Sequence, residues 1–218
     1  MSKECCIVAA GPSPLYYREG AYLIAADGGL EKLREAKKTP DLILGDFDSL
    51  PTHPEGENVL TFPAEKDDTD TMLAIKEALK RGYDRLYISG GIGGRLDHTL
   101  ANLQSLLFAE KLGAEAFLCG EGITATAITR KCAEFSASCR GKISVFCFGD
   151  SASGVTIRGL KYETAGISLS NMFPLGVSNE FTGQSASISL ERGTLILIWD
   201  GAPDDIRLVG PEAPSSHT

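Results

Sequence analysis

Apolar residues in the first part of the chain fall into short runs that are separated by amphipathic segments. The runs predict strands near residues 5–10, 22–26, 42–45, 58–61, 85–89 and 114–119. Between several of these runs, apolar residues recur every three or four positions, which is the spacing of one helix face. Strands that alternate with helices form a mostly parallel sheet with helices on its faces. The pattern therefore predicts an α/β fold for this part of the chain.

Two of the amphipathic segments are long enough to predict complete helices. The segment 69–81 places Met72, Ile75 and Leu79 along one face. A second helix is expected from about 97 to 111. Its regularly spaced apolar residues are Leu96, Leu100, Leu103 and Leu107. We expect these leucines to lie in the core.

After about residue 125 the pattern changes to short apolar runs that are separated by Gly and Ser. These runs cover residues 142–148, 154–159, 185–190 and 194–199. Closely spaced short strands with turn residues between them predict a small antiparallel sandwich or barrel. We therefore expect an α/β domain over residues 1–128, followed by an all-β sandwich domain over residues 129–218. The prolines that follow Gly201 predict a loosely attached tail.

Composition argues against several classes of function, among them nucleic-acid binding and membrane association. A net charge of -8 argues against nucleic acid as a partner, because phosphate backbones are bound through an excess of Lys and Arg. No apolar run approaches the roughly 20 residues of a membrane-spanning helix, and we expect neither a secretory signal nor a membrane partner. The six cysteines show no two-residue spacing of the kind found in zinc or redox motifs. They predict buried thiols in a reducing cytoplasm.

The apolar run at 42–45 ends in two aspartates, Asp46 and Asp48, with one aromatic residue between them. On an extended backbone residues i and i+2 point to the same side, so both carboxylates would face one crevice. Hard oxygen ligands at this separation suit Mg²⁺ that bridges a protein to phosphate oxygens. The alternative is a turn, because Asp and Ser favour turns through hydrogen bonds to nearby backbone groups.

Two further stretches follow predicted strands, at the edge where open parallel sheets bind ligands. Residues 66–70 read Lys-Asp-Asp-Thr-Asp, and the first and last of these aspartates would share one side of a helix's first turn. One aspartate would serve as an ordinary N-cap, whereas three in four positions call for a cation. Residues 90–94 hold four glycines, whose N–H groups could approach a phosphate with Arg95 as a bidentate donor. The alternative for this loop is a plain turn capped by Asp97.

Together these blocks resemble the hallmark sequences of the thiamin pyrophosphokinase (thiamine diphosphokinase) family, in order and at similar spacing. The blocks are Gly-Asp-Phe-Asp-Ser at 45–49, Lys-Asp-Asp-Thr-Asp at 66–70 and Gly-Gly-Ile-Gly-Gly-Arg-Leu-Asp-His at 90–98. Ala-Asp-Gly-Gly at 26–29 is similar to a further block, and residues 159–162 and 177–181 resemble the thiamine-binding segment. Tyr162 and Phe181 stand where some members carry Trp. The resemblance covers nearly the whole chain up to Asp200.

The resemblance implies an α/β catalytic domain, a β-sandwich domain for thiamine binding and dimerisation, and a homodimer whose active sites are shared between subunits. It implies an enzyme, thiamine diphosphokinase, that transfers the pyrophosphoryl group of ATP to the hydroxyl of thiamine and yields thiamine diphosphate and AMP. The expected cofactor is Mg²⁺, with ATP as co-substrate. We expect the metal to be held by Asp46, Asp48 and Asp70. Asp67 would orient the attacking hydroxyl or accept its proton.

The other expected site residues contact the two substrates. Those expected to bind ATP are Asp27, Gly28, Lys66, Gly91, Gly93, Gly94, Arg95, Asp97 and His98. Those expected to bind thiamine are Ser178, Asn179 and Phe181. Thiamine is a cation with a flat ring, so Phe181 would offer an aromatic face, and Ser178 and Asn179 would offer polar groups. Alternatively, Phe181 belongs to the core of the sandwich and Tyr162 is the aromatic residue that meets thiamine.

Two other function classes are compatible with parts of this pattern. The sequence Asp46-Phe47-Asp48-Ser49 resembles metal-dependent phosphatases of the haloacid-dehalogenase type, in which the first aspartate is a phosphorylated nucleophile. Such enzymes do not need the glycine loop at 90–97. A non-catalytic nucleotide-binding sensor could keep the fold, although retention of the acidic positions argues against it. Formation of AMP from ATP and thiamine would support pyrophosphoryl transfer, whereas thiamine-independent phosphate release would support a phosphatase.

Overall fold

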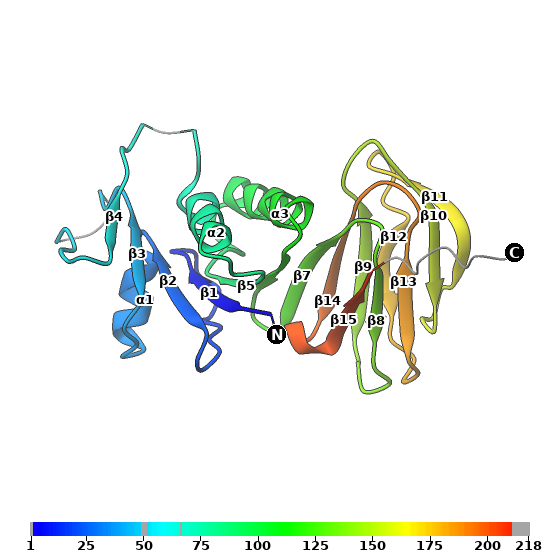
Figure 1. Cartoon of the computed structure of the whole chain (residues 1–218). Helices are drawn as coiled ribbons and strands as arrows, with labels where there is room; N and C mark the ends of the chain where they lie inside the picture. The colour runs from blue at the N-terminus through cyan, green and yellow to red at the C-terminus, as the bar shows by residue number, and fades with distance from the viewer. Residues whose placement is uncertain (1, 49–51, 66, 211–218) are drawn as a thin grey trace, which may run out of the picture. The chain divides into compact units, whose positions relative to one another are not determined.

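The computed structural model describes residues 2–48, 52–65 and 67–210. It contains two compact units, Met1–Glu121 and Gly122–Thr218 (Figure 1). The division lies earlier in the chain than the boundary after residue 128 that the sequence pattern predicts. The reason is the strand Ile123–Ile128, which pairs antiparallel along its whole length with Leu195–Asp200 of the second unit.

The strands of the first unit form a parallel sheet in the order β4, β3, β2, β1, β5 and β6. The strands are β1 (Glu4–Val8), β2 (Tyr22–Ala26), β3 (Leu42–Gly45), β4 (Val59–Thr61), β5 (Arg85–Ser89) and β6 (Glu115–Cys119). All of them lie close to their predicted positions. Except in β4, nearly every side chain is buried, as expected of a parallel sheet covered on both faces. Because the strands are parallel, all their carboxyl ends lie at one edge.

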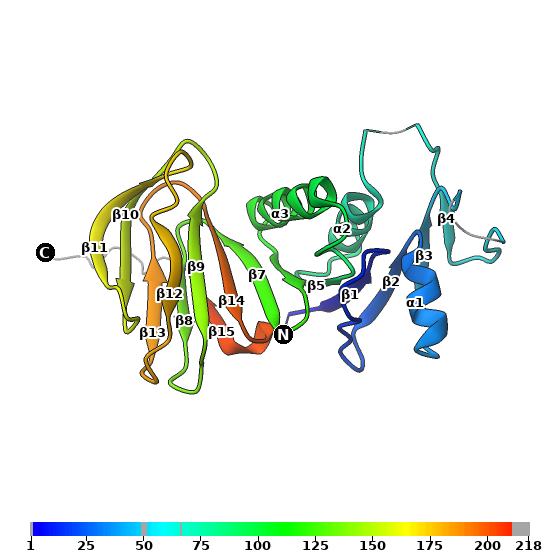
Figure 2. The ribbon, with the colours of Figure 1, turned by 180° about the vertical axis from the view of Figure 1, so that it is seen from behind.

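Three helices cover the faces of this sheet: α1 (Gly29–Glu35), α2 (Asp70–Lys80) and α3 (Leu96–Lys111). The connection through α1 steps toward β4, whereas those through α2 and α3 step toward β6. Since such crossovers are right-handed, α1 lies on one face, and α2 and α3 lie on the other (Figure 1, Figure 2). Within the described residues, no helix is both long and apolar enough to cross a membrane.

The leucines of α3 do not form the core as predicted. Leu96 is 82% exposed and Leu100 is 52% exposed, while the other two leucines of that row are half-buried. The buried side of the helix carries Asn102, Ser105, Leu106, Ala109 and Glu110. Because α3 has apolar residues on more than one side, the helical period alone does not identify the side that meets the sheet.

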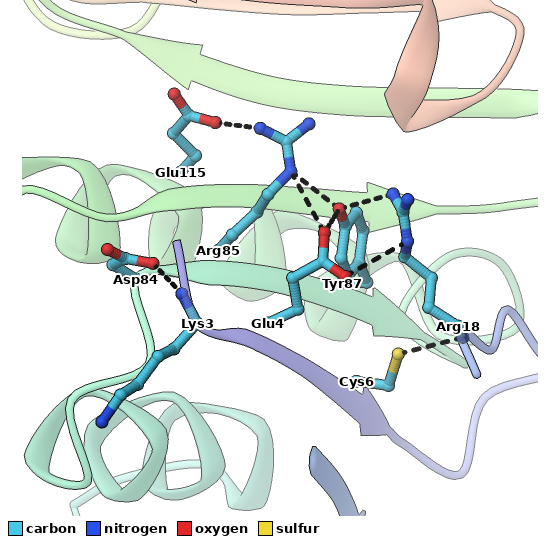
Figure 3. A network of polar contacts seen from close by, with 8 residues as sticks. All are labelled: Lys3, Glu4, Cys6, Arg18, Asp84, Arg85, Tyr87 and Glu115. Carbon is cyan, nitrogen blue, oxygen red and sulfur yellow. Dashed lines mark hydrogen bonds and ion pairs between the residues drawn. The ribbon is translucent and has the colours of Figure 1, made fainter. Parts of the chain in front are cut away.

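A polar network crosses the sheet at the amino ends of β1, β5 and β6 (Figure 3). The Tyr87 hydroxyl accepts hydrogen bonds from Arg18 Nη1 and Arg85 Nε, both at 2.7 Å, and donates one to Glu4 Oε1 at 2.9 Å. Arg85 also forms an ion pair with Glu115 of β6. Burial raises the pKa of Tyr87 to about 12, so the phenol stays protonated and keeps its donor. Acidic and guanidinium groups therefore alternate in this network.

The second unit consists of two antiparallel sheets, in agreement with the predicted sandwich. One sheet has the order β7, β14, β9, β12, and the other has the order β11, β10, β13, β8, β15. The strands are β7 (Ile123–Ile128), β8 (Cys132–Phe135), β9 (Lys142–Cys147), β10 (Ser151–Arg158), β11 (Thr164–Ser170), β12 (Gly176–Glu180), β13 (Ala186–Ser189), β14 (Leu195–Asp200) and β15 (Ile206–Val209). Phe135 of β8 meets Trp199 of β14 edge-on, with ring centroids 5.6 Å apart. The core of the unit thus lies between the two sheets.

Residues 202–209 are part of this fold, so the prediction of a loose tail is wrong for this part of the chain. A 3-10 turn over Pro203–Asp205 leads into β15, which pairs with β8. The Asp205 carboxylate accepts a hydrogen bond from the Ala202 N–H group at 2.7 Å. Proline at the start of a short helix costs nothing, because its missing N–H would have no partner there. Residues 211–218 lie outside the described part of the chain.

Candidate active site

Three aspartates gather at the carboxyl edge of the parallel sheet. Asp27 follows β2, and Asp46 and Asp48 follow β3. One carboxylate oxygen from each lies within 4.8 Å of the other two. From the sequence, Asp27 is predicted to bind ATP and is not among the predicted metal ligands. The register of β2 and β3, which pairs Ala26 with Leu44, makes these residues neighbours.

Close backbone packing holds Asp27 in this cluster. Its N–H group donates to the Leu44 carbonyl at 2.7 Å, and its backbone is in the left-handed region at φ 45°. Gly45, at φ 154°, lies directly beside it: a Cβ atom there would sit 3.0 Å from the Asp27 Cα atom. A larger residue at position 45 would therefore push the two strand ends apart.

The backbone between Asp46 and Asp48 is not extended, so the predicted reason for their proximity is wrong. Phe47 has a φ of 60°, and its side chain is buried with its ring 4.9 Å from the ring of His53. The Asp48 N–H group donates to Asp46 Oδ1 at 3.3 Å, as in an aspartate-stabilised turn. A turn was the alternative to a metal site at these two residues. The structure contains that turn, and the turn itself brings the carboxylates of Asp46 and Asp48 together.

A pocket of about 410 Å³ lies beside the cluster. It is lined by Ala9, Ala10, Gly11, Pro12, Ala26, Asp27, Thr69, Asp70, Thr71, Gly90, Gly91, Gly93, Gly94, Arg95, His98 and Asn102. Seven predicted site residues line it, namely Asp27, Asp70, Gly91, Gly93, Gly94, Arg95 and His98. Gly28, Asp46, Asp48, Asp67 and Asp97 do not line it. Lys66, like Ser49, lies outside the described residues. A second cavity of about 450 Å³, in the other unit, contains no predicted site residue.

The glycine loop forms one wall of the pocket and leads into α3. Its carbonyl at Gly91 accepts a hydrogen bond from Asn102 Nδ2 at 2.9 Å, and its N–H at Gly93 donates to Thr99 Oγ1 at 3.3 Å. Gly90 needs to be glycine, because it has a φ of 72° and a Cβ atom there would collide with the carbonyl of Ala9. Two side chains of α3 therefore hold the loop at the positive end of their own helix.

Arg95 and Asp97 form an ion pair at the exposed start of α3. Arg95 Nη2 donates to Asp97 Oδ2 at 2.6 Å, and Arg95 Nε donates to Oδ1 at 3.2 Å. The hydrogen bond from Arg95 lowers the pKa of Asp97 to about 2, so the carboxylate is ionised at neutral pH. Asp97 thus contacts Arg95 directly, and its role in ATP binding stays a prediction.

The aspartates before α2 do not share one helical turn. Asp70 is the first residue of α2, and the N-cap is Thr69, whose hydroxyl accepts a hydrogen bond from the Met72 N–H at 3.2 Å. Asp67 precedes the helix and is exposed. Asp68 forms an ion pair with Lys76 at 2.7 Å. The start of the helix thus turns Asp70 to the pocket and leaves Asp67 outside it.

Two of the predicted thiamine contacts, Ser178 and Asn179, lie on β12, and the third, Phe181, directly follows it. Asn179 is buried, and its side chain is engaged with the backbone of Tyr162: Nδ2 donates to the carbonyl at 2.8 Å, and Oδ1 accepts from the N–H at 3.0 Å. Ser178 is exposed, with a φ of 61°. Phe181 is only 8% exposed and its ring lies 5.2 Å from that of Phe135. Tyr162, whose backbone is bound by Asn179, is 59% exposed.

Among the residues that contact the pocket walls, Asn102 and Lys32 were not predicted from the sequence. Asn102 supports the glycine loop, and Lys32 of α1 donates to the carbonyl groups of Gly11 and Ser13. An asparagine in the middle of an apolar helix is a weak signal that it holds a nearby backbone group. Nothing in the sequence indicated the contacts of Lys32, because a lysine on a short amphipathic helix usually faces solvent.

Comparisons with known proteins match both units. Residues 14–118 match the family model described as thiamin pyrophosphokinase, catalytic domain, and residues 134–195 match thiamin pyrophosphokinase, vitamin B1 binding domain. The chain is 30% identical over 210 residues to the thiamine pyrophosphokinase of Bacillus subtilis (strain 168), a match that covers 90% of this chain and 98% of that protein.

Solved structures agree. The crystal structure of thiamine pyrophosphokinase from Bacillus subtilis has a TM-score of 0.80 at 26% identity and covers 92% of this chain and 100% of its own. The thiamin pyrophosphokinase structure from Geobacillus thermodenitrificans has a TM-score of 0.78 at 26% identity, with coverages of 93% and 99%. These matches do not support a phosphatase of the haloacid-dehalogenase type. The chain is an enzyme of the thiamine pyrophosphokinase type and belongs to the thiamin pyrophosphokinase family.

Proposed function

We propose that the chain transfers the pyrophosphoryl group of ATP to the hydroxyl of thiamine in the pocket beside the aspartate cluster. The observation that carries this proposal is the position of Asp27, which belongs both to the cluster with Asp46 and Asp48 and to the lining of the pocket. A cation held by the cluster would lie at the wall of a cavity that the glycine loop also lines. Such a cavity is of the size that proteins use for small ligands.

The donor set fits Mg²⁺. Carboxylate oxygens are hard ligands, and oxygens on opposite sides of one Mg²⁺ are about 4 Å apart. The oxygens of Asp27, Asp46 and Asp48 lie within 4.8 Å of one another, so small side-chain rotations would bring them to one ion. Bound there, Mg²⁺ would neutralise charge on the transferred phosphates. Asp70, which lines the pocket from the start of α2, stays a predicted ligand.

The glycine loop and Arg95 would hold the phosphates of ATP. The loop offers N–H groups at the amino end of α3, where the helix dipole favours negative charge. Arg95 lines the pocket and is held by Asp97, so its planar fork is oriented before the nucleotide binds. His98 lines the same wall and stays a predicted contact. Asp67, exposed and outside the pocket lining, keeps only the predicted role of orienting the thiamine hydroxyl.

For thiamine we favour Tyr162 over Phe181 as the aromatic contact. A residue that stacks on a ligand needs an accessible face, and Tyr162 is exposed whereas Phe181 packs in the sandwich core. The polar role predicted for Asn179 also changes, since its amide already holds the backbone of Tyr162. Asn179 would therefore support the thiamine site through Tyr162, and Ser178 remains free to contact the ligand directly.

A homodimer with shared active sites is part of this proposal. Four large apolar side chains between β11 and the middle of β12 are exposed: Met172 at 90%, Phe173 at 67%, Leu175 at 58% and Val177 at 42%. Leu96 and Leu100 are exposed beside the glycine loop of the first unit. An isolated subunit would keep this apolar surface in water, and a second copy of the chain would bury it. Mixing the inactive variant Asp48→Asn with Tyr162→Ala, at thiamine concentrations well below the raised KM of Tyr162→Ala, should give hybrids with one intact site and more activity than either variant alone. Hybrids that form without recovered activity would show that each site comes from one chain.

We also propose a cytoplasmic location, which the cysteines support. Cys5 and Cys6 are fully buried in β1, and burial raises the pKa of both thiols, so they stay protonated and unreactive. Thiols used only for packing are typical of a reducing compartment.

The direct test of the reaction is an assay of AMP and thiamine diphosphate with ATP and Mg²⁺, with and without thiamine. AMP formation that requires thiamine is the expected result. Phosphate release that does not depend on thiamine would contradict the proposal, as would ATP binding without any turnover. Replacing Mg²⁺ by a chelator should abolish the reaction, because the aspartate cluster would then hold no cation.

A further inference from the structure

Lys32 stands out among the charged residues of α1 because its side chain turns to the protein instead of water. Its ammonium group donates hydrogen bonds to the carbonyl oxygens of Gly11 and Ser13, the second at 2.7 Å. Burial takes solvent away from the Lys32 ammonium group, and this desolvation lowers its pKa. Both of these acceptors are backbone groups of one short segment, residues 9–13, which follows β1.

The segment 9–13 forms a wall of the pocket. Ala9, Ala10, Gly11 and Pro12 all line it, and the segment has no helix or strand of its own after β1. Carbonyl groups outside regular structure depend on side chains or water for their partners. The segment's position in the pocket wall therefore depends on contacts such as those from Lys32.

The same segment also packs against the glycine loop. A Cβ atom at Gly11 would collide with the carbonyl oxygen of Gly90. The Pro12 ring lies beside the next turn of the loop: Cβ atoms at Gly93 and Gly94 would be 3.3 and 3.2 Å from it. The segment thus contacts both the ammonium group of Lys32 and the backbone of the glycine loop.

We infer that Lys32 is a positioning residue for ATP binding, which presses the segment 9–13 against the glycine loop and keeps that loop's N–H groups in place. This inference rests on the proposed function, because it matters only if the glycine loop holds phosphates. Lys32 acts through the segment and not by contact with the substrate. The geometry needs a donor that reaches two carbonyl groups at once, which a lysine or an arginine can supply but an uncharged methionine cannot.

The first experiment compares Lys32→Met, Lys32→Arg and the control Lys37→Met. Lys37 is exposed and lies just after the same helix. Loss of two hydrogen bonds from a charged donor predicts a rise in the KM for ATP of roughly tenfold in Lys32→Met. The KM for thiamine and kcat should stay near those of the unchanged chain, Lys32→Arg should recover part of the loss, and Lys37→Met should change nothing. A loss of thermal stability without a change in the KM for ATP would overturn the inference.

The second experiment asks whether Lys32 acts through the segment. Gly11→Ala disturbs the contact with Gly90 directly, and Pro12→Ala takes its place if that variant does not fold. The double variant combines Lys32→Met with Gly11→Ala, or with Pro12→Ala. If Lys32 works through this segment, the double variant should bind ATP no more weakly than the weaker-binding of its two single variants. Losses that multiply would show that Lys32 acts independently. ATP affinity measured by calorimetry without thiamine gives this answer even if the chain fails the turnover test, so the two proposals can fail separately.

Discussion

Acidic residues at the two edges of one parallel sheet have opposite surroundings. At the amino ends, Glu4 and Glu115 lie beside guanidinium groups, and the buried phenol of Tyr87 joins them. At the carboxyl ends, Asp27, Asp46 and Asp48 lie within 4.8 Å of one another. Alternating charges attract, whereas like charges at that distance repel and favour a bound cation. The first arrangement contributes to the fold, and the second suits a ligand at some cost to the fold.

In the second unit, two aromatic residues differ in a similar way: one contributes to the core and the other is available to a ligand. Phe181 is buried against Phe135, so its ring contributes to the core. Tyr162 is exposed and is held in place through its backbone by Asn179. An exposed ring on a fixed backbone can stack on a ligand without a large loss of side-chain entropy. Variants of the charge-paired or buried groups should therefore change stability, and variants of the exposed groups should change activity.

The largest expected effect is that of Asp48→Asn. Loss of one charge from the metal shell should lower turnover by about a thousandfold, which corresponds to several kcal/mol of transition-state stabilisation. The melting temperature should change little, because Asn keeps the volume of Asp and opens no cavity. AMP formation at saturating Mg²⁺ and thermal unfolding measure the two quantities. Asp68→Asn is the control, since Asp68 pairs with Lys76. Near-normal turnover would mean that these aspartates only form a turn.

Phe181→Ala should instead act on stability. Truncating a buried Phe costs about 3 to 5 kcal/mol. We expect this loss in the free energy of unfolding by denaturant, while folded enzyme keeps its KM for thiamine within a few-fold. A strong rise in that KM at unchanged stability would return Phe181 to the thiamine site.

Tyr87→Phe sharpens the comparison at the amino edge. Removing the hydroxyl leaves Arg18, Arg85 and Glu4 with one hydrogen bond fewer each, and bonds to charged groups are worth about 1.5 to 3 kcal/mol. Stability should fall by about that amount, and both KM values should stay unchanged. Tyr83→Phe serves as the control because Tyr83 stacks on Tyr22 through its ring. Equal melting temperatures for Tyr87→Phe and Tyr83→Phe would show that the polar network does not stabilise the fold.

Tyr162→Ala is the functional counterpart of Phe181→Ala. Loss of an aromatic face that contacts a cation should raise the KM for thiamine about tenfold, in line with 1 to 2 kcal/mol for a partly desolvated contact. The KM for ATP and the free energy of unfolding should change little, since the side chain is exposed. Tyr162→Phe should keep most of the affinity. Unchanged thiamine kinetics in Tyr162→Ala would place the ligand elsewhere.

Arg95→Lys should give the smallest effect. The charge remains but the planar fork is lost, so the KM for ATP should rise several-fold to about tenfold. The pKa of Asp97 is lowered from 3.8 to about 2, so the pair with Arg95 is intact above the ordinary pKa and is lost only as the pH falls toward about 2. Any change in the KM for ATP near neutral pH must therefore come from other groups. An unchanged KM in Arg95→Lys would argue against phosphate binding by this residue.

Local sequence determined the elements and the chemistry of the blocks. The strands of the first unit lie close to their predicted positions, because runs such as Leu42–Gly45 are apolar enough to be buried on both faces. The glycines before α3 and the aspartates after β3 also indicated a phosphate and metal site, because few other structures need those residue types together. The resemblance of these blocks to a known family then supplied the reaction.

Only the tertiary structure decided which of these residues meet. Asp27 joins Asp46 because β2 and β3 pair in parallel, and sequence separation does not reveal that register. The exposure of Leu96 and the burial of Phe181 depend on how whole elements pack, which residue spacing leaves open. Lys32 reaches the segment 9–13 because α1 lies against the end of β1, where Gly29 approaches the Val8 carbonyl too closely for any larger residue. Contacts between elements distant in the chain follow from packing and register, whereas the elements follow from local patterns.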